Sequence, residues 1–326
     1  MRFFKVFSLC KLVVMIVERK KNGSTVVLYV RSHNISLEMA KTTDSKEIID
    51  ILREDTDVFD VTTGGLLLRF RKKVIPTAQT ESFYEAVKSL ARLKTANRAR
   101  FQGNQAEPRS KAEDKGKSNK YIMSNIFGFM DGWSASQKQY FQRQHTPIPR
   151  PEIRPSMFNL RFPNRYKQTW PFLRTIDAEY KKLVPDRYRA QRRKANQIRD
   201  FTVAGTAFTT VTLNLNHYSR LHTDSGDDEE GFGNLTVIER GEYRGGETCF
   251  PRYGLGVDVR TGDLLFMNVH EPHSNLPIEY KTPDAQRLSV VCYLRKQIWL
   301  QGRTMTHKQR QIHNKTVRRL LHDNKK

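Results

Sequence analysis

His222 and Asp224 are separated by a single residue, in a segment that follows a β-rich stretch of the chain. If this segment is extended, both side chains emerge on one face, because side chains alternate along a strand. Such a pair can supply two ligands to one metal ion, and the later segment "VHEPHSN" offers His270 and His273 as a third. Two histidines and one carboxylate form the facial triad of non-haem Fe(II) oxygenases, which leaves coordination positions open.

A cation is predicted beside this metal site. The β-rich run "QRLSV" places Arg287 fourteen residues after His273, on a strand that can pass next to the metal. A buried arginine there can hold the far carboxylate of a 2-oxoacid through a charge-assisted pair. A His-x-Asp pair alone is most often a surface pair in a loop. Here a preceding strand, a later histidine and the arginine together favour a metal site.

The strands that must position these residues are expected between Phe201 and Arg295. The runs "FTTVTLNLN", "FGNLTVIER", "GLGVDV", "GDLLFMNV" and "RLSVVCYLR" are short, β-rich and separated by turns that contain glycine. Regular short strands of this kind predict an antiparallel sandwich or barrel. Upstream, apolar residues from Trp170 to Leu183 recur at helical spacing until Pro185, and a densely basic segment follows.

The first part of the chain is expected to be a separate unit. Residues 11–75 read as a small α/β module, with a hairpin turn at Asn22-Gly23 and a helix after a cap at Asp44 or Ser45. Residues 13–17 are interpreted as a strand; a signal peptide at this start is the minor alternative. A helix over residues 81–93 precedes a polar stretch without apolar periodicity, which predicts a flexible linker ending near Lys120.

The composition favours a polyanionic partner. The chain has 57 Lys and Arg residues against 34 Asp and Glu residues, a net charge of +23. Nucleic acid is the favoured partner over a merely solubilising surface. Three cysteines indicate a reducing, intracellular compartment, either nucleus or cytoplasm. No apolar run approaches the ~20 residues that span a bilayer, so no membrane partner is expected.

The segment from "FTTVTLNLNHYSRLHTDSGDDEEGFGNL" to "QRLSVVCYLR" resembles the TET/JBP family of Fe(II)/2-oxoglutarate dioxygenases, in its compact algal, fungal and viral form. The resemblance covers roughly residues 121–300. It implies a mainly β fold with flanking helices, built on a double-stranded β-helix, or jelly-roll. It also implies hydroxylation of the methyl group of a DNA pyrimidine, 5-methylcytosine or thymine, with Fe(II), 2-oxoglutarate and O2. Ascorbate is the alternative co-substrate, as in an algal branch of the family.

The same resemblance assigns roles to individual residues. It implies that His222, Asp224 and His273 bind the metal, with His273 preferred over His270 because the small residue Ser274 and then Asn275 follow it. It places Arg287 on 2-oxoglutarate with Ser289 as a helper. The residues assigned more loosely to the substrate pocket are Asn214, His217 and Asp227. Asp228, Glu229 and Glu230 are expected to be surface acids of the loop.

The expected organisation has four parts. Residues 1–75 form the small module, residues 76–120 the helix and linker, and residues 121–300 the dioxygenase domain with its β core at about 201–295. Residues 301–326 form a basic tail. DNA is expected to bind through two basic flanks, whose members are Arg187, Arg189, Arg192, Arg193 and Lys194 before the core, and Lys308, Arg310, Lys315, Arg318, Arg319, Lys325 and Lys326 after it. Two alternatives remain: a dioxygenase acting on RNA or protein side chains, and a catalytically inactive DNA-binding module.

Overall fold

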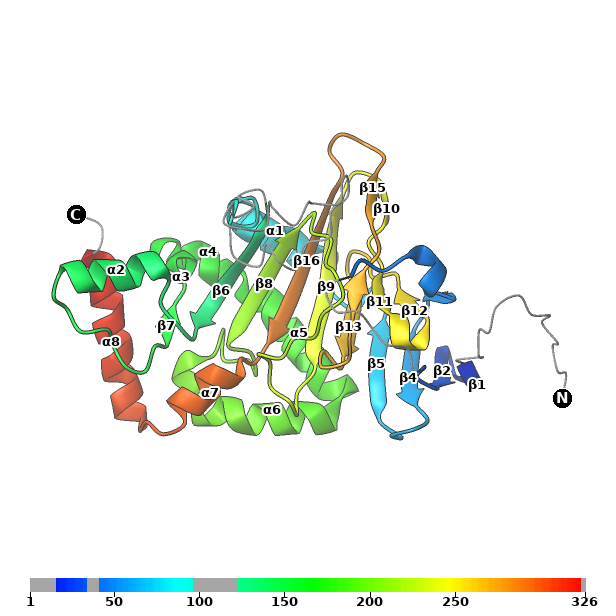
Figure 1. Cartoon of the computed structure of the whole chain (residues 1–326), viewed down its shortest axis with the longest axis horizontal. Coiled ribbons are helices and arrows are strands. Elements are labelled where there is room, and N and C mark those ends of the chain that lie inside the picture. Colours follow the sequence, from blue (N-terminus) through cyan, green and yellow to red (C-terminus); the bar gives the residue numbers. More distant parts are fainter. Residues whose placement is uncertain (1–15, 34–40, 96–121, 324–326) are drawn as a thin grey trace, which may run out of the picture.

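A twisted ten-stranded sheet runs through the computed structural model, which describes residues 16–33, 41–95 and 122–323 (Figure 1). The strands in spatial order are β1 (Ile16–Asn22), β2 (Thr25–Val30), β4 (Thr56–Asp60), β5 (Leu66–Arg71), β13 (Leu264–Met267), β9 (Gly233–Arg240), β16 (Gln286–Tyr293), β8 (Thr210–Leu215), β6 (Ser124–Met130) and β7 (Arg154–Pro155). The central strands β13, β9, β16 and β8 are antiparallel to their neighbours. Their β-branched residues suit a sheet that is covered on both faces.

A second, smaller sheet packs against one face of the large sheet. Its strands are, in order, β14 (Ser274–Asn275), β11 (Thr248–Phe250), β12 (Leu255–Val257) and β3 (Asp50–Leu52). Phe250 and Leu255 from this sheet share a buried apolar cluster with Val237 and Leu265 from the large one. A two-stranded ribbon of β10 (Tyr243–Gly245) and β15 (Ile278–Tyr280) projects beyond the sandwich (Figure 1). The predicted mainly β fold with a jelly-roll core is confirmed.

Helices cover the opposite face of the large sheet. These are α1 (Thr77–Ala91), α5 (Trp170–Leu183) and α6 (Pro185–Gln197). Phe83 of α1 stacks on Phe172 of α5 with 4.1 Å between ring centroids, and Tyr180 stacks on Phe266 of β13 at 5.6 Å. The predicted helical face of residues 170–183 therefore packs on the sheet through its buried members. No helix in the described ranges is long and apolar enough to cross a membrane.

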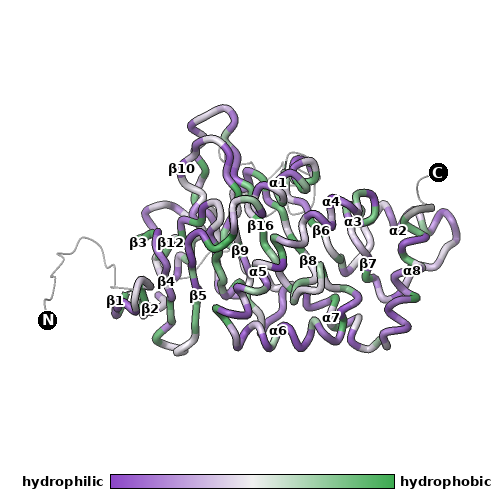
Figure 2. The backbone as a smooth tube through the Cα atoms, turned by 180° about the vertical axis from the view of Figure 1, so that it is seen from behind, coloured by the Kyte–Doolittle hydropathy of each residue, from purple (hydrophilic) through white to green (hydrophobic). Residues whose placement is uncertain are grey.

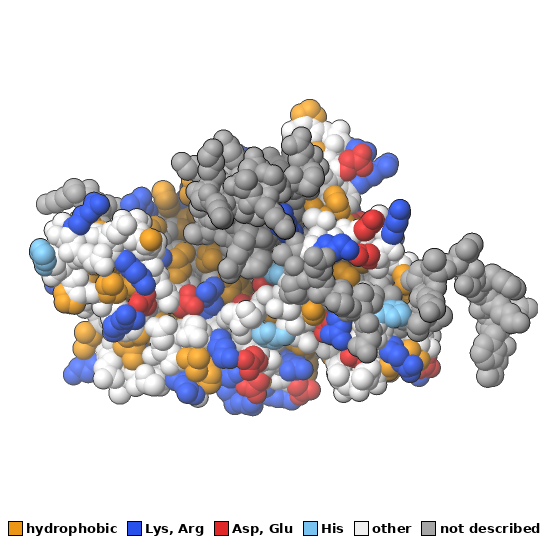
Figure 3. Space-filling model, viewed as in Figure 1, with side chains coloured by type: hydrophobic (Ala, Val, Ile, Leu, Met, Phe, Trp, Pro, Cys, Tyr) orange, Lys and Arg blue, Asp and Glu red, His pale blue; other side chains and the backbone are white. Residues whose placement is uncertain are grey.

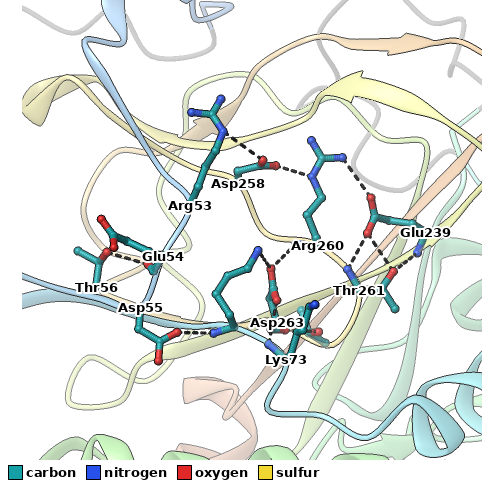
Figure 4. Close-up of polar contacts among 12 residues, drawn as sticks. Arg53, Glu54, Asp55, Thr56, Lys73, Glu239, Asp258, Arg260, Thr261 and Asp263 are labelled. Atoms are coloured by element: carbon teal, nitrogen blue, oxygen red, sulfur yellow. Dashed lines mark hydrogen bonds and ion pairs between the residues drawn. The ribbon is translucent and has the colours of Figure 1, made fainter. Parts of the chain in front are cut away.

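The first strands are part of the jelly-roll, and the prediction of a separate module at residues 1–75 is wrong in this respect. The predicted β1–β2 hairpin is present, with Asn22 opposite Thr25. However, β5 pairs with β13, and β3 pairs with β12. Figure 4 shows the polar contacts at this junction: the Lys73 and Arg260 amides donate to Asp263 at 3.0 and 2.9 Å. Local propensity revealed the β1–β2 hairpin, but it carries no information about which distant strands pair with one another.

The helix expected after Asp44 is reduced to a single 3₁₀ turn, η1 (Ser45–Glu47). Asp44 does cap this turn, as predicted, through a capping box with Glu47. The chain then becomes extended, because the Ile49 amide donates to the Gly254 carbonyl at 2.7 Å and β3 begins at Asp50. The expected helix is weak, because isoleucine is β-branched and has a low helix propensity. Pairing with β12 therefore decides the conformation of this segment.

The basic tail is a folded part of the molecule over residues 301–323. It contains the end of α7 (Lys296–Gly302) and α8 (His307–Asp323). Val317 and Leu321 of α8 are buried against Trp133 and Phe141, next to α2 (Ala135–Arg143). Two short helices, α3 (Met157–Arg161) and α4 (Pro163–Gln168), complete this helical end of the molecule, whose alternating polar and apolar stretches are visible in Figure 2. The predicted helix at 81–93 corresponds to α1, whereas the predicted linker that ends near Lys120 lies outside the described residues from residue 96 onward.

Candidate metal centre

The structure brings His222, Asp224 and His273 together between the two sheets. Their ligand atoms lie within 4.8 Å of one another. Asp224 Oδ1 is 3.7 Å from His222 Nε2, and Asp224 Oδ2 is 3.8 Å from His273 Nε2. Two atoms bound to one metal ion at about 2.1 Å each can lie at most about 4.2 Å apart. Both measured separations are therefore compatible with a shared ion.

Backbone pairing creates this proximity. The amides and carbonyls of His222 and His273 form a reciprocal pair of hydrogen bonds of 2.9 Å each. The Asp224 amide donates to the carbonyl of Val269 at 2.9 Å, so residues 222–224 are held to residues 269–273 at both ends. Since Asp224 lies two residues beyond His222, both side chains point to the face predicted from the sequence.

Both histidines are oriented with Nε2 toward the shared position. His222 Nδ1 lies 2.7 Å from the Arg220 carbonyl, and His273 Nδ1 lies 2.9 Å from the Glu271 carbonyl. A carbonyl can only accept, so Nδ1 carries the proton and Nε2 presents a lone pair. Burial, with His222 nearby, lowers the pKa of His273 to about 4. His273 is thus neutral near pH 7, which is the form that binds a metal.

His270, the alternative third ligand, lies elsewhere. Its Nε2 is 3.3 Å from the Asp228 carbonyl, and it is not part of the cluster of potential ligands. The structure therefore places His273, rather than His270, beside Asp224.

A cavity of about 110 Å³ opens next to the cluster. The three potential ligands line it together with Thr212, Asn214, His217, Ser219, Asp227, Leu235, Thr248, Met267, Asn275, Ser289, Val291 and Tyr293. Four of the five residues predicted near co-substrate or substrate line this cavity: Asn214, His217, Asp227 and Ser289. The fifth, Arg287, is not among the lining residues. Asn214 Oδ1 accepts a hydrogen bond of 2.6 Å from the Ser124 hydroxyl, which fixes that side chain.

Arg287 is buried, with only 2% of its surface exposed. It lies on β16 two residues before Ser289, so it belongs to the same face of the strand as Ser289 and Val291 in the cavity wall. Its Nη2 atom is buried and has no hydrogen-bond partner among the described residues. A buried guanidinium with an unused donor is suited to a carboxylate, so the site fits a 2-oxoacid as well as a metal.

Comparison with known proteins identifies the domain. Residues 136–296, which include the triad and Arg287, match the Tet_JBP family, described as the oxygenase domain of the 2OGFeDO superfamily. The chain carries a Tet_JBP oxygenase domain. This superfamily implies Fe(II) and 2-oxoglutarate, and the His-Asp-His cluster of the Tet_JBP domain provides suitable ligands for the metal.

Curated relatives of the Tet_JBP domain are longer proteins. Thymine dioxygenase JBP1 of Trypanosoma brucei brucei is 31% identical over 158 residues, which are 48% of this chain and 18% of the relative. Bifunctional helicase and thymine dioxygenase JBP2 of Leishmania infantum is 34% identical over 128 residues, 39% of this chain and 11% of the relative. The match thus spans less than a fifth of either relative.

The fold also matches a solved structure. NgTET1 in complex with 5mC DNA superimposes with a TM-score of 0.50 at 13% identity, over 80% of this chain and 82% of that one. The similarity extends beyond residues 136–296, in agreement with the contribution of the first strands to both sheets of the jelly-roll.

The acidic loop of the Tet_JBP domain is held by cations of the flanking helices. Asp228 is buried, and Lys194 of α6 pairs with it and with Glu230. Lys296, at the start of α7, pairs with Glu229. The expectation that these three acids lie on the loop surface holds for Glu229 and Glu230, which are exposed, and is wrong for Asp228, which is buried. The loop that follows Asp224 is fixed at several points.

Sequence reasoning missed part of the cavity wall. Thr212 and Tyr293 line it, and strand alternation from Asn214 and Ser289 would have identified them. Ser219 and Asn275 were also missed as wall residues; the Ser219 hydroxyl donates to Asn275 Oδ1 at 2.6 Å. That contact joins segments far apart in the chain, and no local signal indicates it.

Gly246 is expected to control the position of Arg287 in the Tet_JBP domain. A Cβ atom at Gly246 would lie 2.8 Å from Arg287 Cδ and 2.9 Å from Nε, and the residue has a positive φ of 78°. Gly246→Ala should therefore raise the 2-oxoglutarate concentration needed for turnover while metal affinity stays near that of the parent. Kinetic titration of 2-oxoglutarate and equilibrium metal binding measure the two effects. Gly23→Ala is the control, since its φ is 60° but no atom lies within 4 Å of the added methyl group.

Proposed function

We propose that this protein hydroxylates the methyl group of a pyrimidine base in DNA, 5-methylcytosine or thymine. The observation that carries the proposal is the convergence of His222, Asp224 and His273 beside a cavity inside a Tet_JBP domain. The thymine dioxygenases among its relatives and the 5mC DNA bound to NgTET1 support a base in DNA as substrate.

One set of residues binds the metal and another binds the co-substrate. His222, Asp224 and His273 hold Fe(II) through two imidazole nitrogens and a carboxylate. With 2-oxoglutarate and O2, bound Fe(II) supplies the oxidising power that converts a methyl group into a hydroxymethyl group. Arg287 holds the far carboxylate of 2-oxoglutarate, and Ser289 on the same face of β16 assists. The Nδ1 hydrogen bonds to backbone carbonyls keep both imidazoles aimed at the metal.

The cavity wall offers polar groups to the substrate. Asn214, His217 and Asp227 line the same space as the triad, and all can hydrogen-bond the edge of a base. His273 is 5% exposed, so a base that remains stacked in a duplex cannot reach the metal. We therefore expect the target nucleotide to leave the stack before reaction.

A phosphate-binding surface is proposed on α8. Four exposed cations of this helix, Lys308, Lys315, Arg318 and Arg319, have no carboxylate partner among the described residues. Most cations of the first basic flank are engaged: Arg189 pairs with Asp186, Arg192 donates to the Gly205 carbonyl, Arg187 lies over Phe232, and Lys194 binds the acidic loop. Arg310 is buried against Asp200, so it supports the fold instead. The DNA contact is thus assigned to α8, and Figure 3 shows several cations on the helical end of the molecule that contains it.

Removing the four α8 charges is expected to weaken DNA binding for all sequences alike. Each phosphate contact contributes about 0.9 to the slope of log affinity against log salt, so Gln at all four positions should reduce the slope by up to about 3.6. Deleting the tail is a poor test, because Val317 and Leu321 are buried. The control removes four charges at the other end of the molecule, by Gln at Arg19, Lys20, Lys21 and Arg53. Equal slopes for both variants would contradict the α8 assignment.

The activity is tested by mass spectrometry of nucleosides. Methylated and unmethylated duplex DNA is incubated with the protein, Fe(II), O2 and either 2-oxoglutarate or ascorbate, the possible alternative co-substrate. We expect 5-hydroxymethylcytosine or 5-hydroxymethyluracil with 2-oxoglutarate. Succinate release with RNA or protein substrates but unmodified DNA would favour the alternative dioxygenases. DNA binding without iron-dependent succinate release would indicate an inactive DNA-binding module.

A further inference from the structure

We propose that residues 41–52, which precede the matched family region, hold the segments that carry His222 and His273 on the side away from the metal. Thr43 is the positioning residue. The inference rests on the proposed function, because it assumes that His222 and His273 share a metal. It assigns a role to a segment that the family match at 136–296 does not include.

Two contacts join this segment to the strands that carry the histidines. The Leu221 amide donates to the Lys41 carbonyl at 2.9 Å, directly before His222. The Thr43 and Ser274 hydroxyls lie 2.5 Å apart, directly after His273. Both hydroxyl residues are buried, Thr43 at 4% and Ser274 at 0% exposure. The segment therefore contacts both halves of the His222–His273 pair.

These contacts lie on the side away from the metal. Side chains of successive residues in extended chain point to opposite faces, so the Ser274 side chain points away from the face that His273 presents to Asp224. The bridge of His222 with His273 is isolated, and beside its own two hydrogen bonds the Asn275 amide donates to the Ser219 carbonyl at 3.2 Å. A hydroxyl contact behind the bridge limits movement of the His273 backbone.

Thr43 is itself held firmly. Asp44 caps the turn η1, the Ile49 amide donates to the Gly254 carbonyl, and β3 pairs with β12 of the small sheet. The backbone that follows Thr43 is thus anchored to the sandwich, while the Thr43 hydroxyl contacts Ser274. Loss of its hydroxyl leaves a buried Ser274 hydroxyl without this partner, which favours a shift of the strand that carries His273.

Metal affinity measured without turnover tests this role. Co(II) is titrated into the full-length metal-free protein, and binding is followed by visible absorption. Residues that orient metal ligands typically change affinity 10- to 100-fold when substituted, so Thr43→Val should weaken Co(II) binding by about tenfold. Thr43→Ser keeps the hydroxyl and should stay within about twofold of the parent. Thr56→Val is the matched control, because its equally buried hydroxyl donates to the Glu54 carbonyl at 2.8 Å in the same part of the chain.

Each outcome decides a different point. Co(II) affinity of Thr43→Val equal to that of Thr56→Val would overturn the positioning role. Absence of Co(II) binding in the parent protein would instead overturn the metal site on which the proposed function depends. If Thr43→Val does not fold, Ser274→Ala removes the same contact from the other side and should give the same tenfold loss. A double variant that binds no more weakly than either single variant supports a shared effect of the two hydroxyls, and additive losses contradict it.

Discussion

Alanine at His222, Asp224 or His273 is expected to abolish both tight metal binding and turnover. Each substitution removes one of three ligands from a site in which ligand atoms lie within 4.8 Å of one another. The fold should persist, since apolar clusters on both faces of the large sheet lie outside the triad. Metal content, thermal unfolding and succinate release are measured on the same preparations.

His270→Ala is the matched control for these variants. His270 is near the site in sequence, but its Nε2 lies against the Asp228 carbonyl. We expect it to retain metal and activity. Loss of metal in His270→Ala together with retention in His273→Ala would show that the third ligand has been assigned wrongly.

The second large effect is expected at Arg287. Arg287→Ala should raise the half-saturating concentration of 2-oxoglutarate by roughly 30-fold or more, since a hydrogen bond to a charged group contributes about 2 kcal/mol or more. Arg287→Lys should recover only part of this loss, because an ammonium group cannot reproduce the planar fork of donors. The measurement is initial succinate release across a 2-oxoglutarate series.

Arg244→Ala tests whether any loss of charge near the site has the same effect. Arg244 lies on β10, two residues before Gly246, and its side chain is exposed. Its removal should leave the 2-oxoglutarate requirement unchanged. A requirement that is unchanged in Arg287→Ala as well would contradict the role of Arg287 or indicate that ascorbate is the co-substrate.

The sequence predicted those parts of the site that depend on local periodicity. The two-residue spacing of His222 and Asp224 places them on one face, and the same alternation links Arg287 to Ser289. The β-rich runs between Phe201 and Arg295 predicted the strands of the jelly-roll. These predictions rest on spacing within single elements, which the sequence displays directly.

Other features depend on partners that are distant in the chain. Lys194 was predicted to contact phosphate, but Asp228 and Glu230 surround its ammonium group. Ile48, Ile49 and Leu52 have helical spacing, but residues 50–52 pair with β12 and form strand β3. A charge or an isoleucine has the same local appearance whether its partner is solvent or another element, so sequence alone did not distinguish these cases.

The pairing of β5 with β13 also sets an order of events during synthesis. Leu68 emerges from the ribosome long before Met267, its partner in the sheet, has been made. Until then β5 presents an unpaired edge, and such an edge can associate with other chains. Contacts so far apart in sequence also form late in folding. Completion of the sandwich must therefore wait for the last third of the chain, and slower translation there prolongs the interval in which nascent chains can aggregate.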